Sequence, residues 1–302
     1  MTLLARIAGR TRRATREITD IPLRRRLGSR PRAARSLASL SDLGTQPLLL
    51  VFAHPDDEVI AAGALMQRPP RVGLVTLTSG ATRHGSYARR AGFDSWLDYG
   101  HARQMETEAA LGWLGREVAP RRNLGLPDMG TMDELVAITR HLVGQLRQGV
   151  SYVVTHAYEG GHPDHDSAAF CVHAACALIG REGGRPPVIV EAPLYNEHDG
   201  AVVHSQFLPH EDAGAPVTFH LSADEQALKR RMYESYVTQR ETMADFGVGT
   251  EIFREAPRYH FSCAPQNGGA AYDNYGWPIR SPSWRRSAWR AMRELDLTAE
   301  LA

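Results

Sequence analysis

The chain has 302 residues, 43% of them hydrophobic and 23% charged, a composition typical of a globular protein with one large domain or two small ones. Its 35 basic and 34 acidic residues nearly cancel, which argues against a nucleic-acid coat protein, so we expect no nucleic-acid partner. The cancellation is uneven, because residues 1–36 contain 11 arginines and two acids. Without that segment, 24 basic and 32 acidic side chains remain, so the body of the chain is mildly acidic.

The cysteines and the apolar runs narrow the choice of compartment. Cys171, Cys176 and Cys263 cannot make a disulfide framework and match no zinc spacing, so we expect buried thiols in a reducing, cytoplasmic environment. The sequence contains no run of about 18 apolar residues, so it predicts no transmembrane helix, and the basic N-terminus lacks the apolar core of a signal peptide. Residues 1–45 are expected to be an Arg-rich extension, either a flexible tail or a peripheral contact with an anionic membrane.

The body alternates strand patterns with helix patterns. Apolar runs predict buried strands at residues 48–53, 71–78, 151–155 and 188–192. Helical spacing predicts helices at residues 58–67, 101–114, 133–147, 166–179 and 222–242. Polar or Gly- and Pro-rich composition predicts long loops at residues 81–99 and 263–287. This order predicts an α/β fold, with a Rossmann-like, mostly parallel β-sheet sandwiched between helices. We expect one domain at residues 46–260, with a C-terminal loop and helix extension at 261–302 packed on it.

Two His-Pro-Asp segments follow predicted strands. His54-Pro55-Asp56-Asp57-Glu58 comes directly after one strand, and His162-Pro163-Asp164-His165-Asp166 lies between another strand and the next helix. Ligands of open parallel sheets bind at the carboxyl ends of the strands, so both segments are expected at one site. Imidazole and carboxylate groups suit zinc, and a spare carboxylate beside the ligands could activate water. Either segment alone could be a turn or a helix cap, but the pair favours a metal site.

The paired segments also resemble a known family. Ala53-His54-Pro55-Asp56-Asp57-Glu58 together with His162-Pro163-Asp164-His165 is similar to the motifs of the LmbE/PIG-L family of zinc-dependent de-N-acetylases, over about residues 46–245. The resemblance implies an LmbE-like fold and one zinc ion per chain. It also implies hydrolysis of the acetamide of an N-acetylglucosamine-type sugar in a glycan, glycolipid or glycoside, giving acetate and a free aminosugar.

The resemblance further implies roles for single residues. His54, Asp57 and His165 match the metal ligands of the family. Asp56 matches the general base that activates water. His162 matches the histidine that stabilises the oxyanion or protonates the leaving amine.

Three more residues are expected to contact substrate. Arg103 matches an Arg-x-x-Glu of the family, with a surface salt bridge to Glu106 as the alternative. Asp128 matches a Leu-Pro-Asp turn, with a purely structural turn as the alternative. Tyr158 is a candidate because Gly160 stands where some members of the family have a tyrosine that polarises the substrate carbonyl.

Two other functions fit the same residues. The protein could be a zinc amidohydrolase that acts on a non-sugar N-acyl metabolite, or a non-catalytic module that binds a glycan or lipid. Five aromatic residues are candidate stacking platforms for a sugar ring, with core packing as the alternative: Trp96, Tyr99, Tyr195, Trp277 and Trp284.

Overall fold

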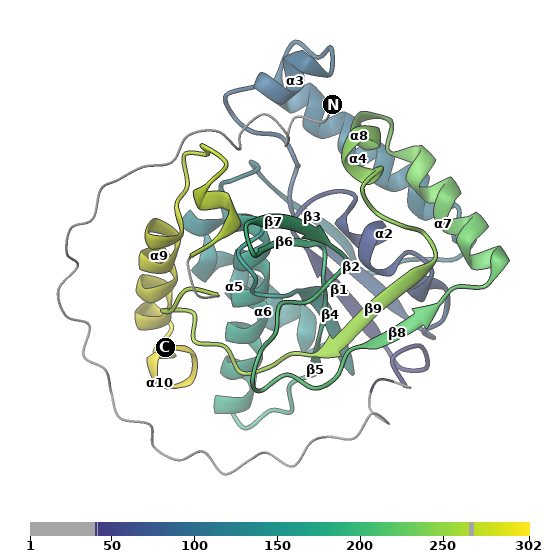
Figure 1. The fold of residues 1–302 in the computed structure, drawn as a ribbon. Coiled ribbons are helices and arrows are strands. Elements are labelled where there is room, and N and C mark those ends of the chain that lie inside the picture. Colours follow the sequence, from purple (N-terminus) through teal and green to yellow (C-terminus); the bar gives the residue numbers. More distant parts are fainter. Residues whose placement is uncertain (1–39, 41, 266–268) are drawn as a thin grey trace.

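The computed structural model describes residue 40 and residues 42–265 and 269–302 (Figure 1). Its strands are β1 (Leu48–Phe52), β2 (Val72–Thr78), β3 (Arg121–Leu126), β4 (Tyr152–His156), β5 (Val188–Ala192), β6 (Tyr195–His198), β7 (Ala201–His204), β8 (Val217–His220) and β9 (Thr250–Glu255). Its helices are α2 (Asp57–Ala62), α3 (Ser86–Arg90), α4 (Trp96–Gly112), α5 (Leu135–Leu146), α6 (Pro163–Arg181), α7 (Ala223–Ser235), α8 (Arg240–Met243), α9 (Ser281–Glu294) and α10 (Thr298–Leu301). Short 3-10 turns are η2 (Leu65–Gln67), η3 (Thr131–Asp133), η4 (Val237–Gln239) and η5 (Ala271–Asp273).

The central sheet has the strand order β3-β2-β1-β4-β5-β9-β8. β3, β2, β1, β4 and β5 pair in parallel, whereas β9 and β8 are added in antiparallel orientation at one edge. The hairpin of β6 and β7 pairs separately. The prediction of a mostly parallel α/β sheet is therefore confirmed, and the antiparallel edge is an addition that the weak pattern after residue 192 did not indicate.

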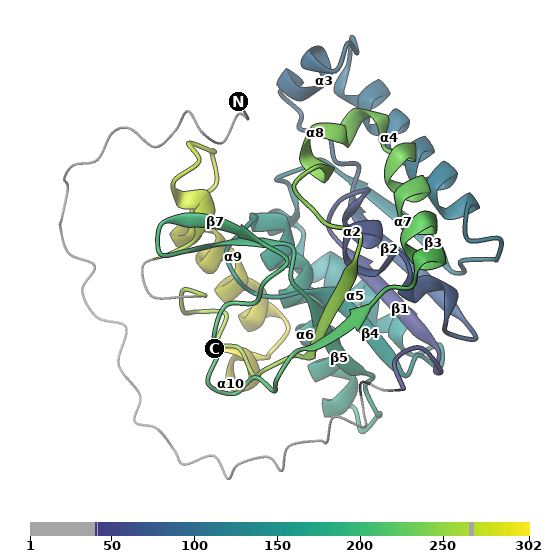
Figure 2. The same cartoon turned by 45° about the vertical axis from the view of Figure 1, so that its right-hand side comes forward.

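Helices cover both faces of this sheet, and the strand period explains how. In β1, Leu49 and Val51 face a cluster that includes residues of α5, α6 and α9. Leu48 and Leu50 point the other way, into a cluster with residues of α2, α4 and α7. Because neighbouring side chains of a strand alternate, a continuous apolar run is what a strand buried on both faces requires. The two helix layers on either side of the sheet are visible in Figures 1 and 2.

Several element boundaries differ from the predicted ones. α3 and the start of α4 lie inside the predicted loop 81–99, where Ser95 caps α4 by accepting a hydrogen bond from the Asp98 backbone N–H at 3.1 Å. α9 begins inside the predicted loop 263–287. Gly85 and Gly92 in the first loop, and Gly and Pro residues near α9 in the second, hide the helical period, so composition alone predicts a loop.

The termini of the body also differ from expectation. Leu40 and Leu43 are buried in the cluster beneath α2, so packing begins before the predicted boundary at residue 46. The rest of the predicted Arg-rich extension lies largely outside the described residues. At the other end, α9 and α10 contribute Trp284 and Leu301 to the cluster with α5 and α6. Cys263 is exposed, which corrects the expectation that all three thiols are buried.

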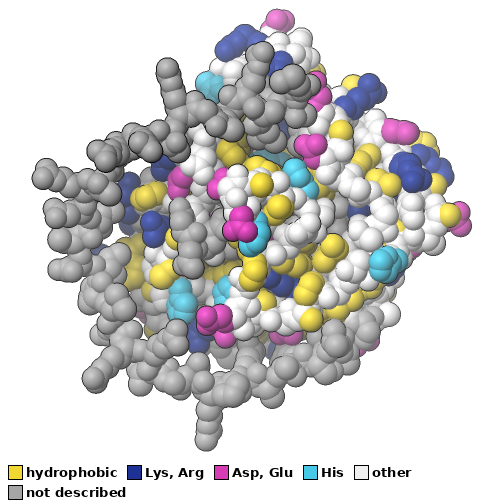
Figure 3. Space-filling model, in the orientation of Figure 1, with side chains coloured by type: hydrophobic (Ala, Val, Ile, Leu, Met, Phe, Trp, Pro, Cys, Tyr) yellow, Lys and Arg dark blue, Asp and Glu magenta, His cyan; other side chains and the backbone are white. Residues whose placement is uncertain are grey.

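The surface is mixed in charge where it can be seen. On the face shown in Figure 3, acidic, basic and histidine side chains are interspersed among apolar ones. In the part of the chain that the structure describes, no helix has the length and apolar character needed to cross a membrane.

A buried ion pair fixes the end of α2. Lys229 is the only lysine of the chain, and its side chain is fully buried. Its Nζ donates to the Ile60 carbonyl at 2.9 Å and to Glu251 Oε1 at 3.0 Å. Glu251 in turn accepts hydrogen bonds from the backbone N–H groups of Ala64 and Leu65. The pair therefore joins α7 and β9 to the helix that follows β1.

We predict that Lys229→Met lowers the free energy of unfolding by about 3–5 kcal/mol, because it leaves the Glu251 carboxylate buried without its cation. The double variant Lys229→Met/Glu251→Gln should recover part of this loss, since both charges are then absent. Urea unfolding measures the effect. Arg140→Met is the control, because the Arg140–Glu294 pair is exposed and should contribute under about 1 kcal/mol. Equal losses in Lys229→Met and Arg140→Met would contradict the prediction.

A half-buried histidine makes stability depend on pH. His173 of α6 packs against Tyr259 and Phe261, each with ring centroids 5.4 Å away, and its Nε2 has no hydrogen-bond partner. Burial lowers the pKa of His173 to about 4. The unfolded chain binds this proton near pH 6.5, so it holds more protons than the folded chain between these values. Stability is therefore lost as pH falls from about 6.5 to about 4.

We predict that His173→Leu reduces the loss of stability between pH 8 and pH 5 by about 1–2 kcal/mol. Urea unfolding at both pH values measures the difference. His101→Leu, which replaces an exposed histidine of α4, should keep the wild-type pH dependence. The prediction is wrong if both variants lose stability in parallel with the wild type.

Candidate functional site

The pairing of β1 with β4 brings the two His-Pro-Asp segments together. Leu48 of β1 pairs with Tyr152 of β4 in parallel register, so both strands end at the same edge of the sheet. His54 follows β1, and His162 is the N-cap residue of α6, a few residues after β4. The second segment thus forms the cap and first turn of α6, where it was predicted to precede the helix.

Three donor atoms converge at this edge. His54 Nδ1 lies 3.2 Å from Asp57 Oδ2 and 3.2 Å from His165 Nε2, and Asp57 Oδ2 lies 3.5 Å from His165 Nε2. A tetrahedral zinc ion with bonds of about 2.0–2.1 Å holds its ligand atoms about 3.3–3.4 Å apart. Two imidazole nitrogens and one carboxylate oxygen at these separations fit three corners of such a site. The structure therefore brings together the three residues that the sequence suggested as ligands.

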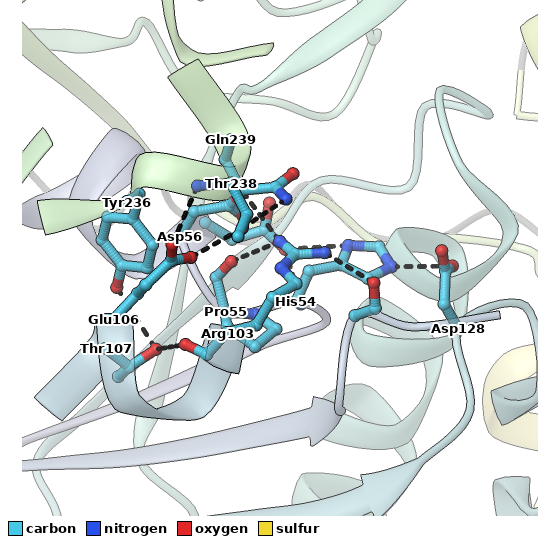
Figure 4. A network of polar contacts seen from close by, with 12 residues as sticks. His54, Pro55, Asp56, Arg103, Glu106, Thr107, Asp128, Tyr236, Thr238 and Gln239 are labelled. Carbon is cyan, nitrogen blue, oxygen red and sulfur yellow. Dashed lines mark hydrogen bonds and ion pairs between the residues drawn. The ribbon is translucent and has the colours of Figure 1, made fainter. Parts of the chain in front are cut away.

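The His54 ring is oriented from its other side. Its Nε2 lies 3.3 Å from Asp164 Oδ2 and 3.3 Å from Asp128 Oδ1. A proton on Nε2 satisfies these carboxylates and leaves the Nδ1 lone pair for a metal, the arrangement that usually supports a histidine ligand. Burial lowers the pKa of His54, but the hydrogen bonds to Asp128, Asp164 and Asp57 raise it well above its usual value, so a metal ion would have to displace the proton from Nδ1. Figure 4 shows the ring directed toward Asp128.

The other two donors are held in the forms that bind cations. Burial raises the pKa of Asp57, but the nearby His165, His156 and His54 rings lower it well below its usual range, so the carboxylate is ionised. Burial and the neighbouring His156 lower the pKa of His165 well below its usual value, despite the charge on Asp57. An ionised carboxylate and a neutral imidazole are the states that ligate a divalent ion.

Asp56 occupies a constrained position beside these donors. Its φ is 120°, a conformation that costs a non-glycine residue about 1–3 kcal/mol. Glu58 Oε2 accepts the Asp56 backbone N–H at 3.1 Å, and Arg103 donates to Asp56 Oδ2 at 2.9 Å. Burial raises the pKa of Asp56 to about 8, although the Arg103 charge opposes the rise. The carboxyl group is thus held in place and has an affinity for protons near neutral pH.

His162 is fixed as a particular tautomer by the cap of α6. Its Nδ1 accepts a hydrogen bond from the Asp164 backbone N–H at 3.1 Å, so the proton of the neutral ring is assigned to Nε2. That Nε2 lies 3.6 Å from Asp128 Oδ1. Burial and the charge on His54 lower the pKa of His162 to about 4. The residue therefore presents an N–H donor to the site.

Two of the expected substrate contacts need correction. The Arg103 guanidinium is buried and donates to the carbonyls of Gly80 and Pro55 as well as to Asp56, so it holds the first segment and is not free for substrate (Figure 4). Glu106 does not pair with Arg103. It accepts hydrogen bonds from the Thr238 backbone and hydroxyl.

Tyr158 is also misplaced by the prediction. It is 3% exposed and stacks on Trp284 in the core, and its hydroxyl donates to the Cys263 carbonyl at 2.8 Å. By contrast, Asp128 lies beside His54 and His162, within the cluster. Tyr158 is only four residues before His162 in the chain, but its ring packs into the core cluster that contains residues of α6 and α9.

Two residues of the cluster had no predicted role. His156 ends β4, stacks on His165 with ring centroids 3.9 Å apart, and accepts the Ala53 backbone N–H at 3.0 Å. Asp164 accepts the Met129 N–H and the Thr131 hydroxyl in addition to its contact with His54. Both could contribute to other possible metal-binding groups, but these hydrogen bonds already use them. The position of His156 at the carboxyl end of a buried strand is the signal that could have identified it.

The aromatic candidates separate by location. Trp277 contacts the His162 ring edge-on at 4.9 Å, and Tyr195 contacts the His165 ring at 5.2 Å. Trp284 and Tyr99 are buried in packing clusters, and Trp96 packs against the cluster of Tyr99. Of these five aromatic residues, Trp277 and Tyr195 therefore border the histidines of the candidate site.

The comparisons with known proteins agree with this geometry. Residues 49–176 match the family PIG-L, GlcNAc-PI de-N-acetylase. A 1D-myo-inositol 2-acetamido-2-deoxy-alpha-D-glucopyranoside deacetylase 2 of Catenulispora acidiphila is 30% identical over 172 residues, which are 48% of this chain. The chain spans about half the length of that curated relative, 56%.

Solved structures show the same fold. The A40926 pseudoaglycone deacetylase has a TM-score of 0.52 and 19% identity, over 69% of this chain and 96% of that chain. A deacetylase of the teicoplanin biosynthesis pathway has a TM-score of 0.53 and 18% identity, over 70% of this chain and 97% of that chain. The range matched to the PIG-L family contains both His-Pro-Asp segments and most of the strands that position them, so the likeness covers the candidate site.

Proposed function

We propose that this protein is a zinc-dependent de-N-acetylase that hydrolyses the acetamide of an N-acetylglucosamine-type sugar and releases acetate and a free aminosugar. The observation that carries the proposal is the triangle of His54 Nδ1, Asp57 Oδ2 and His165 Nε2, with sides of 3.2–3.5 Å and a proton-accepting carboxyl group beside it. The family match and the deacetylase relative support the same class of reaction.

His54, Asp57 and His165 would hold one zinc ion through these three atoms. When bound, zinc supplies a positive charge that polarises water and the acetamide carbonyl. The fit rests on the donor types and separations, and on the Asp164 and Asp128 carboxylates that orient His54 from behind.

Asp56 would act as the general base. Arg103 holds its Oδ2, while Oδ1 has no hydrogen-bond partner among the described residues and is left to accept a proton. A base with a pKa near the working pH is the most effective, because it can both take up and release the proton. The value of about 8 for Asp56 lies in that range.

His162 would donate from Nε2 to the developing oxyanion or to the leaving amine. Its tautomer is set by the cap of α6, so the N–H is already oriented before substrate binds. Asp128, 3.6 Å from this nitrogen, would accept hydrogen bonds from sugar hydroxyls. Arg103 would position Asp56 and would not bind substrate.

The curated relative supports the proposed substrate class. The curated relative is named for a deacetylase of an acetamido-sugar inositol, which favours a sugar amide over a non-sugar N-acyl metabolite. The sugar would be carried by a glycan, glycolipid or other small glycoside.

We also propose a cytoplasmic location, with peripheral membrane contact through the Arg-rich residues 1–45, and a catalytic unit at residues 46–260.

We predict that zinc raises the melting temperature of metal-depleted protein, because a ligand that binds only the folded state adds about 2.7 kcal/mol at a hundredfold excess over its Kd. Asp57→Asn and His165→Ala should lose most of this shift, measured by thermal denaturation with and without Zn²⁺. His101→Ala, at an exposed histidine of α4, should keep it. An unchanged shift in His165→Ala would remove that residue from the ligand set.

We predict that Asp56→Asn lowers kcat for acetate release by about 10²–10⁴-fold and keeps the zinc-induced thermal shift, because it removes a base but no ligand. Acetate is measured with an N-acetylglucosaminide and with a non-sugar acetamide. Full activity of folded Asp56→Asn would contradict the mechanism. Acetate from the non-sugar amide alone would contradict the substrate class.

A further inference from the structure

The C-terminal segment 270–284 lies outside the range matched to the family, yet it touches the motif that carries two of the site histidines. Its contacts reach Gly160, before the stretch from His162 to His165, and Asp166 and Ser167, which follow that stretch in α6. All of these contacts are buried. They raise the question of whether the segment only fills the core or also sets the position of the site.

The first set of contacts joins the segment to the loop before α6. The Ala271 N–H donates to the Gly160 carbonyl at 2.8 Å. The Gly160 N–H donates to Asp166 Oδ1 at 3.0 Å, and the Tyr272 hydroxyl donates to Asp166 Oδ2 at 3.1 Å. One carboxylate thus receives a donor from the loop and a donor from the C-terminal segment.

Gly160 shows how closely the segment approaches. Its φ is +69°, and a Cβ atom at this position would lie 2.8 Å from the Ala270 Cβ and 2.9 Å from the Ala270 Cα. Both the backbone conformation and the lack of space therefore require glycine here. A larger side chain at this position would collide with the segment.

A second contact lies one residue further along α6. Trp284 Nε1 donates to Ser167 Oγ at 2.9 Å, and that hydroxyl donates to the Pro163 carbonyl at 2.8 Å. Trp284 and Ser167 are fully buried. The first turn of α6, which contains His165, is therefore tied to the C-terminal segment through Asp166 and through Ser167.

We propose that residues 270–284 are a brace that positions the first turn of α6, with Tyr272 as its principal positioning residue. The inference rests on the proposed metal role of His165. The Tyr272 hydroxyl fixes Asp166, Asp166 fixes Gly160, and together they hold the helix start at the distance from His54 that a metal ion needs. Groups that orient metal ligands from outside typically change metal affinity by 10–100-fold when removed.

The test compares two variants that remove the same chemical group. Tyr272→Phe removes the hydroxyl that bonds Asp166, whereas Tyr158→Phe removes a hydroxyl that bonds the Cys263 carbonyl, outside both residues 270–284 and α6. The two losses should shift the urea midpoint to a similar extent. The two variants should differ in the mobility and zinc affinity of the site only if Tyr272 positions it.

Two measurements on the full chain need no substrate. In metal-free protein, hydrogen exchange of a peptide spanning residues 159–170 should accelerate in Tyr272→Phe and stay at the wild-type rate in Tyr158→Phe. Competition with a chromophoric chelator should show Zn²⁺ binding at least tenfold weaker in Tyr272→Phe and within twofold of wild type in Tyr158→Phe. Ser167→Ala, which removes the acceptor of Trp284, should resemble Tyr272→Phe.

The outcomes separate the brace from the proposed activity. Equal exchange rates in the 159–170 peptide of Tyr272→Phe and Tyr158→Phe would overturn the brace, even if the wild type deacetylates sugars. A wild type that releases no acetate would overturn the proposed activity, while faster exchange confined to Tyr272→Phe and Ser167→Ala would still support the brace.

Discussion

β1 and β4 lie side by side and parallel in the middle of the sheet, and this pairing brings two segments more than a hundred residues apart to a common edge. A histidine-containing stretch follows each strand, so the pairing brings imidazoles from both segments to the same edge of the sheet. A shift of one residue would exchange the side chains of β1 that face the two helix layers and so would disturb the packing of both layers. Every feature of the site described above depends on this alignment.

The edge so formed carries more negative than positive groups in a buried space. Asp56, Asp57, Asp128 and Asp164 lie around the His54 ring or close to it in the chain, and burial by itself would favour the neutral forms of Asp56, Asp57 and Asp128. Asp57 and Asp128 are nevertheless kept ionised, because the rings of nearby histidines lower their pKa values. A divalent cation at the donor triangle would add the positive charge that this set of carboxylates favours. Asp56 keeps a raised pKa, since burial outweighs the charge of Arg103 there.

Other residues hold the candidate metal ligands in place without being ligands themselves. Arg103 and Glu58 fix the strained backbone of Asp56, and the buried pair of Lys229 and Glu251 anchors the far end of α2. Tyr272, through its hydrogen bond to Asp166, positions the second His-Pro-Asp segment. These groups come from α4, α7, β9 and the C-terminal segment, so the site depends on elements across the whole described body. A site held within a few tenths of an ångström needs such support, because loops alone would let the donor atoms separate.

The sequence by itself determined the fold class and the identity of the chemical groups. The apolar runs at β1 and β4 require burial on both faces, and the His-Pro-Asp segments after them contain the ligand types of a metal site. Only the tertiary structure decided which atoms converge. Arg103 turned inward to Asp56, Tyr158 entered the core, and His156 joined the cluster, because side-chain direction depends on the exact end of each strand and helix. The contacts of Tyr272 and Trp284 with α6 join residues more than a hundred positions apart, and no local pattern encodes a pairing at that distance.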